Sequence, residues 1–484
     1  MLIKTPIIQV EQTEMHILNM RTRFPFQYGI ASLTAIPHLF IKVEVNIEGM
    51  GTFQGLTSEG LPPKWFTKNP DTTFEEDLPA FFEVINFAFE TAKATKPGTW
   101  FQLWQEVYNK QQTNNWSEGV SPLLANLGVA LVERATVDAI CRGMGMRLHQ
   151  TLTRNYLGID LAQVREGLTD IPVDQPFIHA KPFDTVHVRH TVGLGDPLTE
   201  ADTAESGPLD DGLPYTLEEN IREYGLEWFK IKLCGDPDTD FNRLWEIADL
   251  LRAMEVKNAH FTMDGNEQFK DLEFFKYFFE GCQEDDTVRE FFDKSLVFVE
   301  QPFHRDIALS TDLREWEDRP HIVLDESDQD LDSLPKALEL GYQGCSFKNC
   351  KGIVKGLANA ALLAQYRSKD PHGSYILSGE DLANVGPIAL NQDLAMVASL
   401  GIRHVERNGH HYFRGLSMFP EDMWDEIVEP GLFRIHDDGF PTLAINNGDL
   451  DLRRVTRAPF GANCFPETEK FTPVADWSPD SLGI

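Results

Sequence analysis

The sequence lacks the features that mark secreted or membrane proteins. Its six cysteines, spread over 484 residues, form no CxxC pair and are too sparse for a disulfide scaffold, so we expect reduced and mostly buried thiols. No apolar run approaches the ~18 residues that a membrane span needs, and the N-terminus has no signal-peptide pattern. The prediction is a cytoplasmic protein that makes no membrane contact.

Positive charge is also scarce. The chain has 43 Lys+Arg against 76 Asp+Glu, which gives a formal net charge of −33. Such a surface repels phosphate backbones, so we expect no nucleic-acid partner. A glycine-rich phosphate loop after a first strand is missing as well, which argues against an open, doubly wound nucleotide-binding fold.

What the sequence does have, from about residue 180, is a regular alternation of short β-rich runs with amphipathic helical stretches. Eight such units over roughly 240 residues favour a parallel (β/α) barrel over an open sheet. The eight runs are TVHVRHTV, EWFKIKL, AHFTMD, SLVFVE, HIVLDE, GCSFKN, SYILSG and IRHVER. The sequence therefore predicts an α/β protein built on a barrel.

The remaining chain has a different texture. Residues 1–60 alternate apolar and polar positions like antiparallel strands, and residues 75–148 repeat apolar positions at helical spacing. We therefore predict an α+β N-terminal capping domain at 1–175, completed by the tail 430–484, and a barrel at 180–430 that carries the catalytic and metal site. An extra acidic segment, 281–294, precedes the fourth barrel strand.

Charged residues stand at the ends of five consecutive strand-like runs. In barrels of this kind the active site lies at the C-terminal ends of the strands. A single acid there is usually a helix cap, but Asp264, Glu300 and Asp325 follow three neighbouring runs. Three carboxylates without His or Cys suit Mg²⁺ or Mn²⁺ far better than Zn²⁺.

Lysines flank these acids in the strand order. Lys230 and Lys232 share one face of their strand, and at about 7 Å and an effective dielectric near 20 they repel by about 2.4 kcal/mol. Such repulsion lowers the pKa of one lysine and prepares it as a general base. Two solvated lysines on an exposed strand are the alternative, which the apolar flanking residues disfavour. Lys348, four strands further round the barrel, is expected to face Lys232 across the mouth.

These residues carry a family resemblance. The strings FKIKL, TMDGNEQF, FVEQPF, VLDES and CSFKNCKGI resemble the strand motifs of the enolase superfamily, in its mandelate racemase/muconate lactonizing enzyme (MLE) branch and closest to the MLE subgroup. The resemblance covers most of the chain. It implies a modified TIM barrel of the (β/α)7β type, a small-molecule carboxylate substrate and a homo-oligomer. It also implies Asp264, Glu300 and Asp325 as Mg²⁺ ligands, Lys232 and Lys348 as the acid/base pair, and Lys230 as the lysine that modulates Lys232.

The chain departs from the family pattern in several places. Lys351-Gly352 replaces the usual glycine pair after the sixth-strand lysine, which adds a cation nearby. HVERNGHHYFRG stands where dipeptide epimerases have an aspartate pair, and no His–Asp pair of the mandelate racemase type is present. In the capping domain, GLTSEGLPPKWFTK replaces a short segment. The aromatic stretch RFPFQYGIAS lies where the family places a substrate-covering loop, or it packs at the domain interface.

Further residues are candidates for substrate contact. Glu380 and Asp381 either touch substrate or cap the next helix. His187, Arg189 and His190 on the first strand either bind an acidic substrate or have a structural role. The candidate substrate-binding residues are Asn266, Tyr28, His190, Glu380 and Glu406.

The function expected from these residues is that of an Mg²⁺-dependent lyase or isomerase. It would remove the proton α to a carboxylate, with the metal stabilising the enediolate. Epimerisation, cycloisomerisation and dehydration share this step. One rival is a superfamily member that binds carboxylates without catalysis. Another is a metal-dependent hydrolase, which generally needs histidine ligands that His187-Val-Arg189 does not supply.

Overall fold

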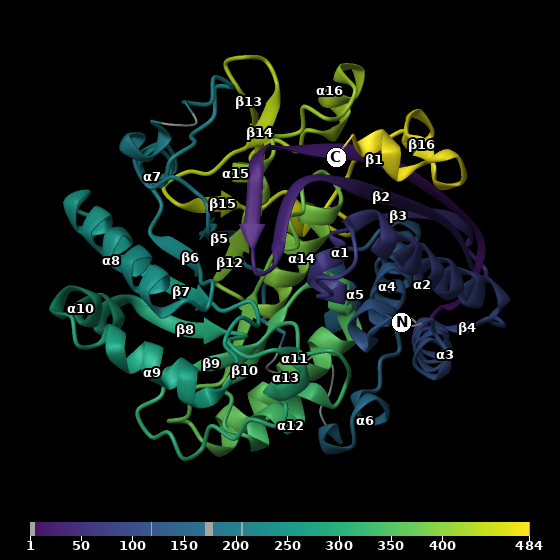
Figure 1. Cartoon of the computed structure of the whole chain (residues 1–484). Helices are drawn as coiled ribbons and strands as arrows, with labels where there is room; N and C mark the ends of the chain where they lie inside the picture. Colours follow the sequence, from purple (N-terminus) through teal and green to yellow (C-terminus); the bar gives the residue numbers. More distant parts are fainter. Residues whose placement is uncertain (1–4, 118, 170–177, 205–206, 484) are drawn as a thin grey trace.

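The computed structural model describes residues 5–117, 119–169, 178–204 and 207–483. It contains an antiparallel sheet with helices packed on it and a closed parallel barrel surrounded by helices (Figure 1). The predicted α/β class and the barrel with an N-terminal antiparallel domain are therefore confirmed.

The N-terminal sheet is an antiparallel meander of β1 (Ile7–Tyr28), β2 (Ala31–Ile47) and β3 (Gly51–Gly60). Gly29 and Gly49 take positive φ angles of 50° and 77° in the two turns, a conformation that favours glycine. Three helices follow: α2 (Phe74–Ala94), α3 (Trp100–Thr113) and α4 (Pro122–Met144). Helix α4 is buried along most of its length between the sheet and its neighbours and ends where Gly145 turns left-handed.

The stretch GLTSEGLPPKWFTK contains the end of β3 and a five-residue helix, α1 (Pro63–Thr67), between β3 and α2. Its aromatic residues Trp65 and Phe66 are buried. The short helix therefore projects apolar side chains from the N-terminal domain toward the rest of the molecule.

All eight β-rich runs form strands of the barrel. The strands are parallel and pair in sequence order, and β12 pairs with β5 to close the circle. They are β5 (Thr185–Val192), β6 (Trp228–Lys232), β7 (His260–Asp264), β8 (Leu296–Glu300), β9 (Ile322–Leu324), β10 (Gly344–Phe347), β11 (Ile376–Gly379) and β12 (His404–Arg407).

Helices surround this barrel on its outside (Figure 1). The acidic insertion forms a second helix, α10, ahead of β8. The helices between and after the strands are α7 (Leu217–Tyr224), α8 (Pro237–Ala253), α9 (Leu272–Cys282), α10 (Asp286–Ser295), α11 (Arg305–Ala308), α12 (Ser333–Glu339), α13 (Ile353–Lys369), α14 (Ala389–Leu400), α15 (Gly409–Tyr412) and α16 (Trp424–Ile427).

The C-terminal tail contacts both sheets. Strand β15 (Asp449–Asp451) pairs antiparallel with the start of β5, and β16 (Thr472–Pro473) pairs with β1. A hairpin of β13 (Phe433–Ile435) and β14 (Pro441–Leu443) lies between them in sequence. The predicted domain boundary at residue 175 lies outside the described residues, and the division into domains stays a prediction.

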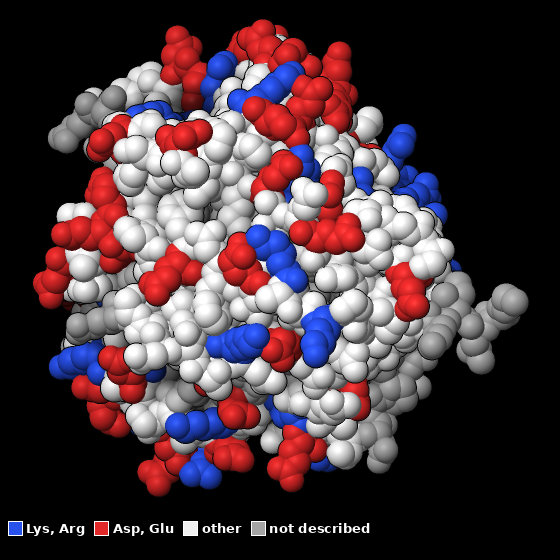
Figure 2. All heavy atoms as spheres, turned by 90° about the vertical axis from the view of Figure 1, so that its right-hand side faces the viewer, with Lys and Arg blue, Asp and Glu red and all other residues white. Residues whose placement is uncertain are grey.

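The surface carries the charge excess seen in the sequence. Figure 2 shows acidic side chains spread over one whole face, with fewer basic ones among them. The six cysteines are free, and four of them are buried, as predicted. Among the described residues, no helix is both long and apolar enough to cross a membrane.

Candidate active site

A small cavity lies at the C-terminal ends of the barrel strands, under the N-terminal domain. Its upper wall is aromatic and apolar and comes from β1 and the α1 segment. Its lower wall is polar and comes from strand ends. The apolar lining includes Phe26, Tyr28, Pro62, Trp65, Leu382 and Ala383, and the polar lining includes Lys232, Lys348, Asp381, Glu406 and Asn408.

Lys232 and Lys348 reach this cavity from β6 and from the end of β10, which lies four strands further round the barrel. Lys232 Nζ donates a hydrogen bond of 2.6 Å to Asp264 Oδ2, and Lys348 Nζ donates one of 2.7 Å to Asp325 Oδ2. Both lysines are buried. Each ammonium group therefore has one carboxylate beneath it.

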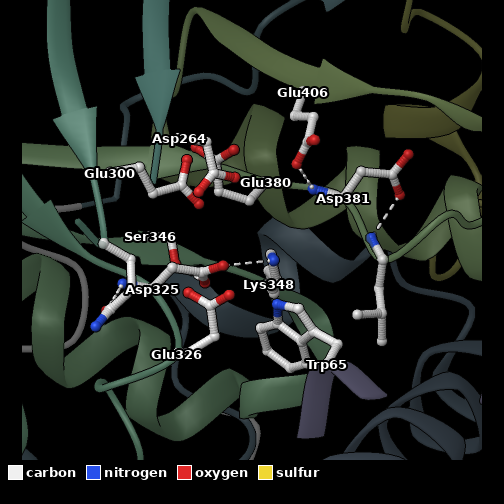
Figure 3. A network of polar contacts seen from close by, with 12 residues as sticks. Trp65, Asp264, Glu300, Asp325, Glu326, Ser346, Lys348, Glu380, Asp381 and Glu406 are labelled. Carbon is white, nitrogen blue, oxygen red and sulfur yellow. Dashed lines mark hydrogen bonds and ion pairs between the residues drawn. The ribbon is translucent and has the colours of Figure 1, made fainter. Parts of the chain in front are cut away.

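Each of the two lysines also has an aromatic ring beside it. Lys348 Nζ lies 4.2 Å from the centroid of the Trp65 ring, and Lys232 Nζ lies 5.8 Å from that of Tyr28. An ammonium group over a ring face is attracted by the ring's quadrupole. In Figure 3 the Trp65 ring lies against Lys348. The aromatic wall therefore contacts the polar one and separates it from solvent.

Lys230 lies deeper, at the centre of a cluster of carboxylates. Its Nζ donates hydrogen bonds to Glu380 Oε2 at 2.8 Å and Glu406 Oε2 at 3.0 Å. It also lies 2.9 Å from Asp264 Oδ2 and 2.8 Å from Glu300 Oε2. Burial by itself would lower the pKa of Lys230, but these four carboxylates outweigh it and raise the pKa well above its usual value. The predicted repulsion between Lys230 and Lys232 is therefore outweighed at Lys230 by the acids around it.

Glu300 is the least satisfied acid of the site. It is fully buried, and neither of its carboxylate oxygens receives a hydrogen bond from any described residue, although Lys230 is close. Burial, and then the nearby carboxylates of Asp264 and Glu380, raise its pKa well above the usual range. Figure 3 shows these three carboxylates gathered together. A further cation would stabilise this buried carboxylate, because it lies among other carboxylates.

Asp325 is the opposite case. Lys348 contacts its Oδ2 atom, while Lys351 Nζ lies 2.8 Å from Oδ1 and Ser346 also donates to Oδ1. Burial would raise the pKa of this carboxyl, but the neighbouring lysines hold it well below its usual value. Both oxygens of this carboxylate therefore already have charged partners.

The three strand-end acids suit a hard divalent cation in their chemistry and their location. Carboxylate oxygens are the preferred ligands of Mg²⁺, and Glu300 offers two that receive no hydrogen bond from any described residue. Among the described residues, however, no three His, Cys, Asp or Glu side chains form a ready-made metal cluster. Lysine ammonium groups hold Asp264 and Asp325 instead. A metal would have to displace some of these contacts.

Arg305, which follows β8, fastens the α1 segment over the cavity. Its guanidinium donates to the backbone carbonyls of Phe66 at 2.7 Å and Trp65 at 3.0 Å. The same group forms two 2.8 Å hydrogen bonds with the carboxylate of Glu267, which Lys68 approaches to 3.3 Å. The barrel therefore holds the lid segment by its backbone, with charge-assisted hydrogen bonds.

The structure brings some of the candidate substrate residues to the cavity. Tyr28 and Glu406 line it, and Glu406 also accepts a 2.8 Å hydrogen bond from Thr191. Asn266 lies beside the cavity floor, where its backbone N–H donates to Asp264 and its side chain to Glu326. Glu380 lies beneath the cavity with Lys230, while Asp381 lines it and caps the turn that follows β11.

The structure does not bring His190 to the cavity. Side chains of a strand alternate between its two faces, and Arg189 and Thr191 point into the barrel toward Glu380 and Glu406. His190 points the other way, and its Nδ1 atom lies 3.0 Å from Nε2 of His410 in α15. Of the other first-strand candidates, His187 pairs with Asp449 in β15. His187 and His190 therefore have contacts away from the cavity, whereas Arg189 contacts Glu380 within the barrel.

Sequence reasoning missed several residues that line the cavity. Trp65 and Pro62 lie in the stretch GLTSEGLPPKWFTK, whose place beside Lys348 the sequence pattern does not indicate. Asn408 directly follows β12, is almost fully buried and has no hydrogen-bond donor on its Oδ1 atom among the described residues. Its position, two residues after Glu406, is the signal that could have identified it.

No family model and no curated protein sequence matches the chain. Solved structures do. The mandelate racemase/muconate lactonizing protein from Herpetosiphon aurantiacus is 17% identical, with 95% of this chain and 99% of that chain covered at a TM-score of 0.59. 2-Chloromuconate cycloisomerase from Rhodococcus opacus 1CP is 14% identical, with 96% of this chain and 99% of that chain covered at a TM-score of 0.58.

A third similar structure is a dipeptide epimerase from Enterococcus faecalis V583 in complex with Mg and the dipeptide L-Leu-L-Tyr. It is 13% identical, with 94% of this chain and 99% of that chain covered at a TM-score of 0.57. At such identities the likeness establishes the fold. The chain has the fold of the mandelate racemase/muconate lactonizing group of the enolase superfamily, as its motifs suggested.

Proposed function

We propose that this protein is an enzyme that removes the proton α to the carboxylate of a small organic acid. The observation that carries the proposal is the convergence of Lys232 and Lys348 on one cavity from strands on opposite sides of the barrel. A substrate between them presents one face to each ammonium or amine. One lysine takes the α-proton, and the other returns a proton to the opposite face or stabilises the charge that develops.

The surrounding residues prepare this proton transfer. Asp264 and Asp325 hold the two lysines in place, and Lys230 neutralises the acids beneath the substrate. Tyr28 and Trp65 exclude water, which strengthens every electrostatic interaction within the cavity. Asn408, with its unused oxygen, is placed to accept a hydrogen bond from the distal part of the substrate.

Mg²⁺ is the proposed cofactor, with Asp264, Glu300 and Asp325 as its protein ligands and Mn²⁺ as an alternative. When bound, it would supply the positive charge that an enediolate requires. Two observations support it: the buried carboxylate of Glu300, whose oxygens receive no hydrogen bond from any described residue, and the Mg present in the complex of the structurally similar dipeptide epimerase. Epimerisation, cycloisomerisation and dehydration all begin with this proton transfer.

The experiment that tests the proposal is incubation of the protein with pooled carboxylic acids and Mg²⁺ in D₂O. A gain of one mass unit in one acid identifies the substrate by its exchanged α-proton, whatever the complete reaction is. Omission of Mg²⁺ should prevent the exchange. Absence of exchange across a broad pool, with ligand binding still detectable, would contradict the proposal.

That last outcome would favour a second candidate, a carboxylate-binding protein without catalysis. The specific observation behind it is the state of Asp264 and Asp325, whose carboxylates are held by lysines instead of being free for a metal. A carboxylate ligand could bind to Lys232 and Lys348 in the same cavity without any proton transfer. The D₂O experiment separates the two candidates because binding leaves the mass of the acid unchanged.

A further inference from the structure

Lys351 is a charged residue beside the site that the proposed reaction does not use. It lies in the short turn between β10 and α13, where the resemblance would place a glycine. Its side chain is almost fully buried. A buried ammonium group at this position needs an explanation, since burying a charge is costly unless it is paired.

The ammonium group of Lys351 is enclosed by oxygen atoms. Nζ donates to the backbone carbonyl of Asp325 at 2.6 Å and to Ser346 Oγ at 2.8 Å, and it lies 2.8 Å from Asp325 Oδ1. A protonated lysine has three N–H donors, and these three oxygens satisfy all of them. The side chain therefore acts as a cation bound in a small oxygen cage, one wall of which is the carboxylate of Asp325.

The backbone around Lys351 is fixed in turn. Gly352 has a positive φ of 100°, and a Cβ atom there would lie only 3.1 Å from Glu133 Oε2. Glu133 belongs to α4, and its carboxylate accepts hydrogen bonds from the backbone N–H groups of Ile353 and Val354 at the start of α13. The turn that carries Lys351 is therefore anchored from the N-terminal domain.

We infer that Lys351 is a built-in competitor of the divalent cation for Asp325. The Lys351 ammonium group and the divalent cation both need Oδ1 of Asp325. The positive charge of Lys351 also repels the cation. The inference rests on the proposed function, which makes Asp325 a metal ligand. It predicts that the unmodified protein binds the metal more weakly than a variant that keeps the three strand-end carboxylates and lacks the charge of Lys351.

The test measures Mg²⁺ and Mn²⁺ binding by titration calorimetry, with no substrate present. Lys351→Met removes the charge and keeps the bulk, and Lys351→Gln is a second neutral variant in case the first does not fold. Lys351→Arg retains the charge. The matched control is Lys355→Met, because Lys355 is a buried lysine of the adjoining helix α13 that contacts Asp328 and not Asp325.

Both neutral variants should bind metal roughly tenfold or more tightly than the unmodified protein, because the charge removed lies against a ligand oxygen and is buried from screening salt. Lys351→Arg and Lys355→Met should bind with unchanged affinity. Unchanged or weaker binding by the neutral variants would overturn the inference, and would show that Lys351 only positions Asp325.

Asp325→Asn separates this failure from failure of the proposed function. If the unmodified protein binds metal and Asp325→Asn does not, the proposed ligand set stands whatever Lys351 does. If no form binds metal, or if Asp325→Asn binds as well as the unmodified protein, the proposed metal site falls, and the inference about Lys351 falls with it.

Discussion

The two sides of the barrel mouth are built from the same parts and differ in their charge balance. On the β6–β7 side, Lys232 pairs with Asp264 beneath Tyr28. On the β9–β10 side, Lys348 pairs with Asp325 beneath Trp65. The second side has an additional cation in Lys351, and its turn is fastened from α4.

We propose that the two lysines have unequal tasks. Burial would lower the pKa of Lys348, yet Asp325 raises it well above its usual value, which favours the charged form. A lysine held in its charged form is suited to donate a proton or to stabilise negative charge. We therefore assign the base to Lys232, and to Lys348 the role of acid or charge stabiliser.

The largest expected effect comes from breaking this pair. Lys232→Ala should lower the rate of α-proton exchange by roughly 10²–10⁴-fold, the contribution typical of a general base. The exchange is measured by mass spectrometry on the acid identified in D₂O. Lys348→Ala should instead allow exchange to continue on one face while turnover to product stops. Substantial exchange in Lys232→Ala, with metal binding intact, would contradict the assignment.

The next largest effect is expected at Glu133 of α4, which holds the turn after β10. Burial raises the pKa of Glu133 to about 8 from its usual 4.5. The folded state therefore favours the protonated carboxyl, and this contribution to stability is complete below about pH 4.5 and lost as the pH rises to about 8. Glu133→Gln imitates the protonated form and should remove this loss. Its free energy of unfolding in urea should exceed that of the unmodified protein at about pH 8 by on the order of a few kcal/mol, and match it at about pH 4.5.

Glu106→Gln, on the exposed surface of α3, provides the control and should show the same pH dependence as the unmodified protein. If the free energy of unfolding of Glu133→Gln changed with pH in the same way as that of the unmodified protein, Glu133 would be ionised in the folded state across this range.

A smaller effect is expected at Arg305, which holds the α1 segment over the cavity. Arg305→Met removes the hydrogen bonds to the carbonyls of Trp65 and Phe66, and charged hydrogen bonds of this kind contribute about 1.5–3 kcal/mol. Trypsin should then cleave after Lys64 or Lys68 roughly tenfold faster, because the segment opens more often. Arg314→Met, which changes an exposed arginine paired with Asp312, is the matched control. Equal cleavage rates in both variants would show that other contacts hold the lid.

The smallest effect is expected at the opposite end of the barrel. His187 lies at the start of β5, where it is half-exposed and paired with Asp449. His187→Ala should leave α-proton exchange and metal affinity unchanged within about twofold. A larger loss of exchange would mean that the first strand takes part in the site after all.

Much of the fold and of the site could be predicted because both follow strand periodicity. Each strand-like run became a barrel strand, and the charged residues at the run ends met at one rim. The contacts of Lys230 with Glu380 and Glu406 could not be predicted, since they join strands distant in sequence and depend on side-chain rotamers. The sequence also does not reveal which face of β5 points inward, and this left His190 among the candidates.

The lid was the part least accessible to sequence reasoning. The α1 segment has no periodic pattern that fixes its direction, and its place over Lys348 depends on Arg305 in a distant strand loop. Aromatic residues in a segment of unusual length were the available signal. Packing between domains, in contrast to strand order, is determined by shape complementarity that a linear pattern does not contain.

The pairing of β16 with β1 has a consequence for how the protein is made. Ile17 pairs with Thr472 and His16 with Pro473, so the edge of the first sheet receives this strand from residues translated long after β1. At roughly 5–20 residues per second, the ribosome needs tens of seconds between the two. During this interval the edge of β1 offers unpaired backbone groups to any other strand. A newly made chain should therefore be open to pairing with other strands at this edge until residues 472–473 have been made.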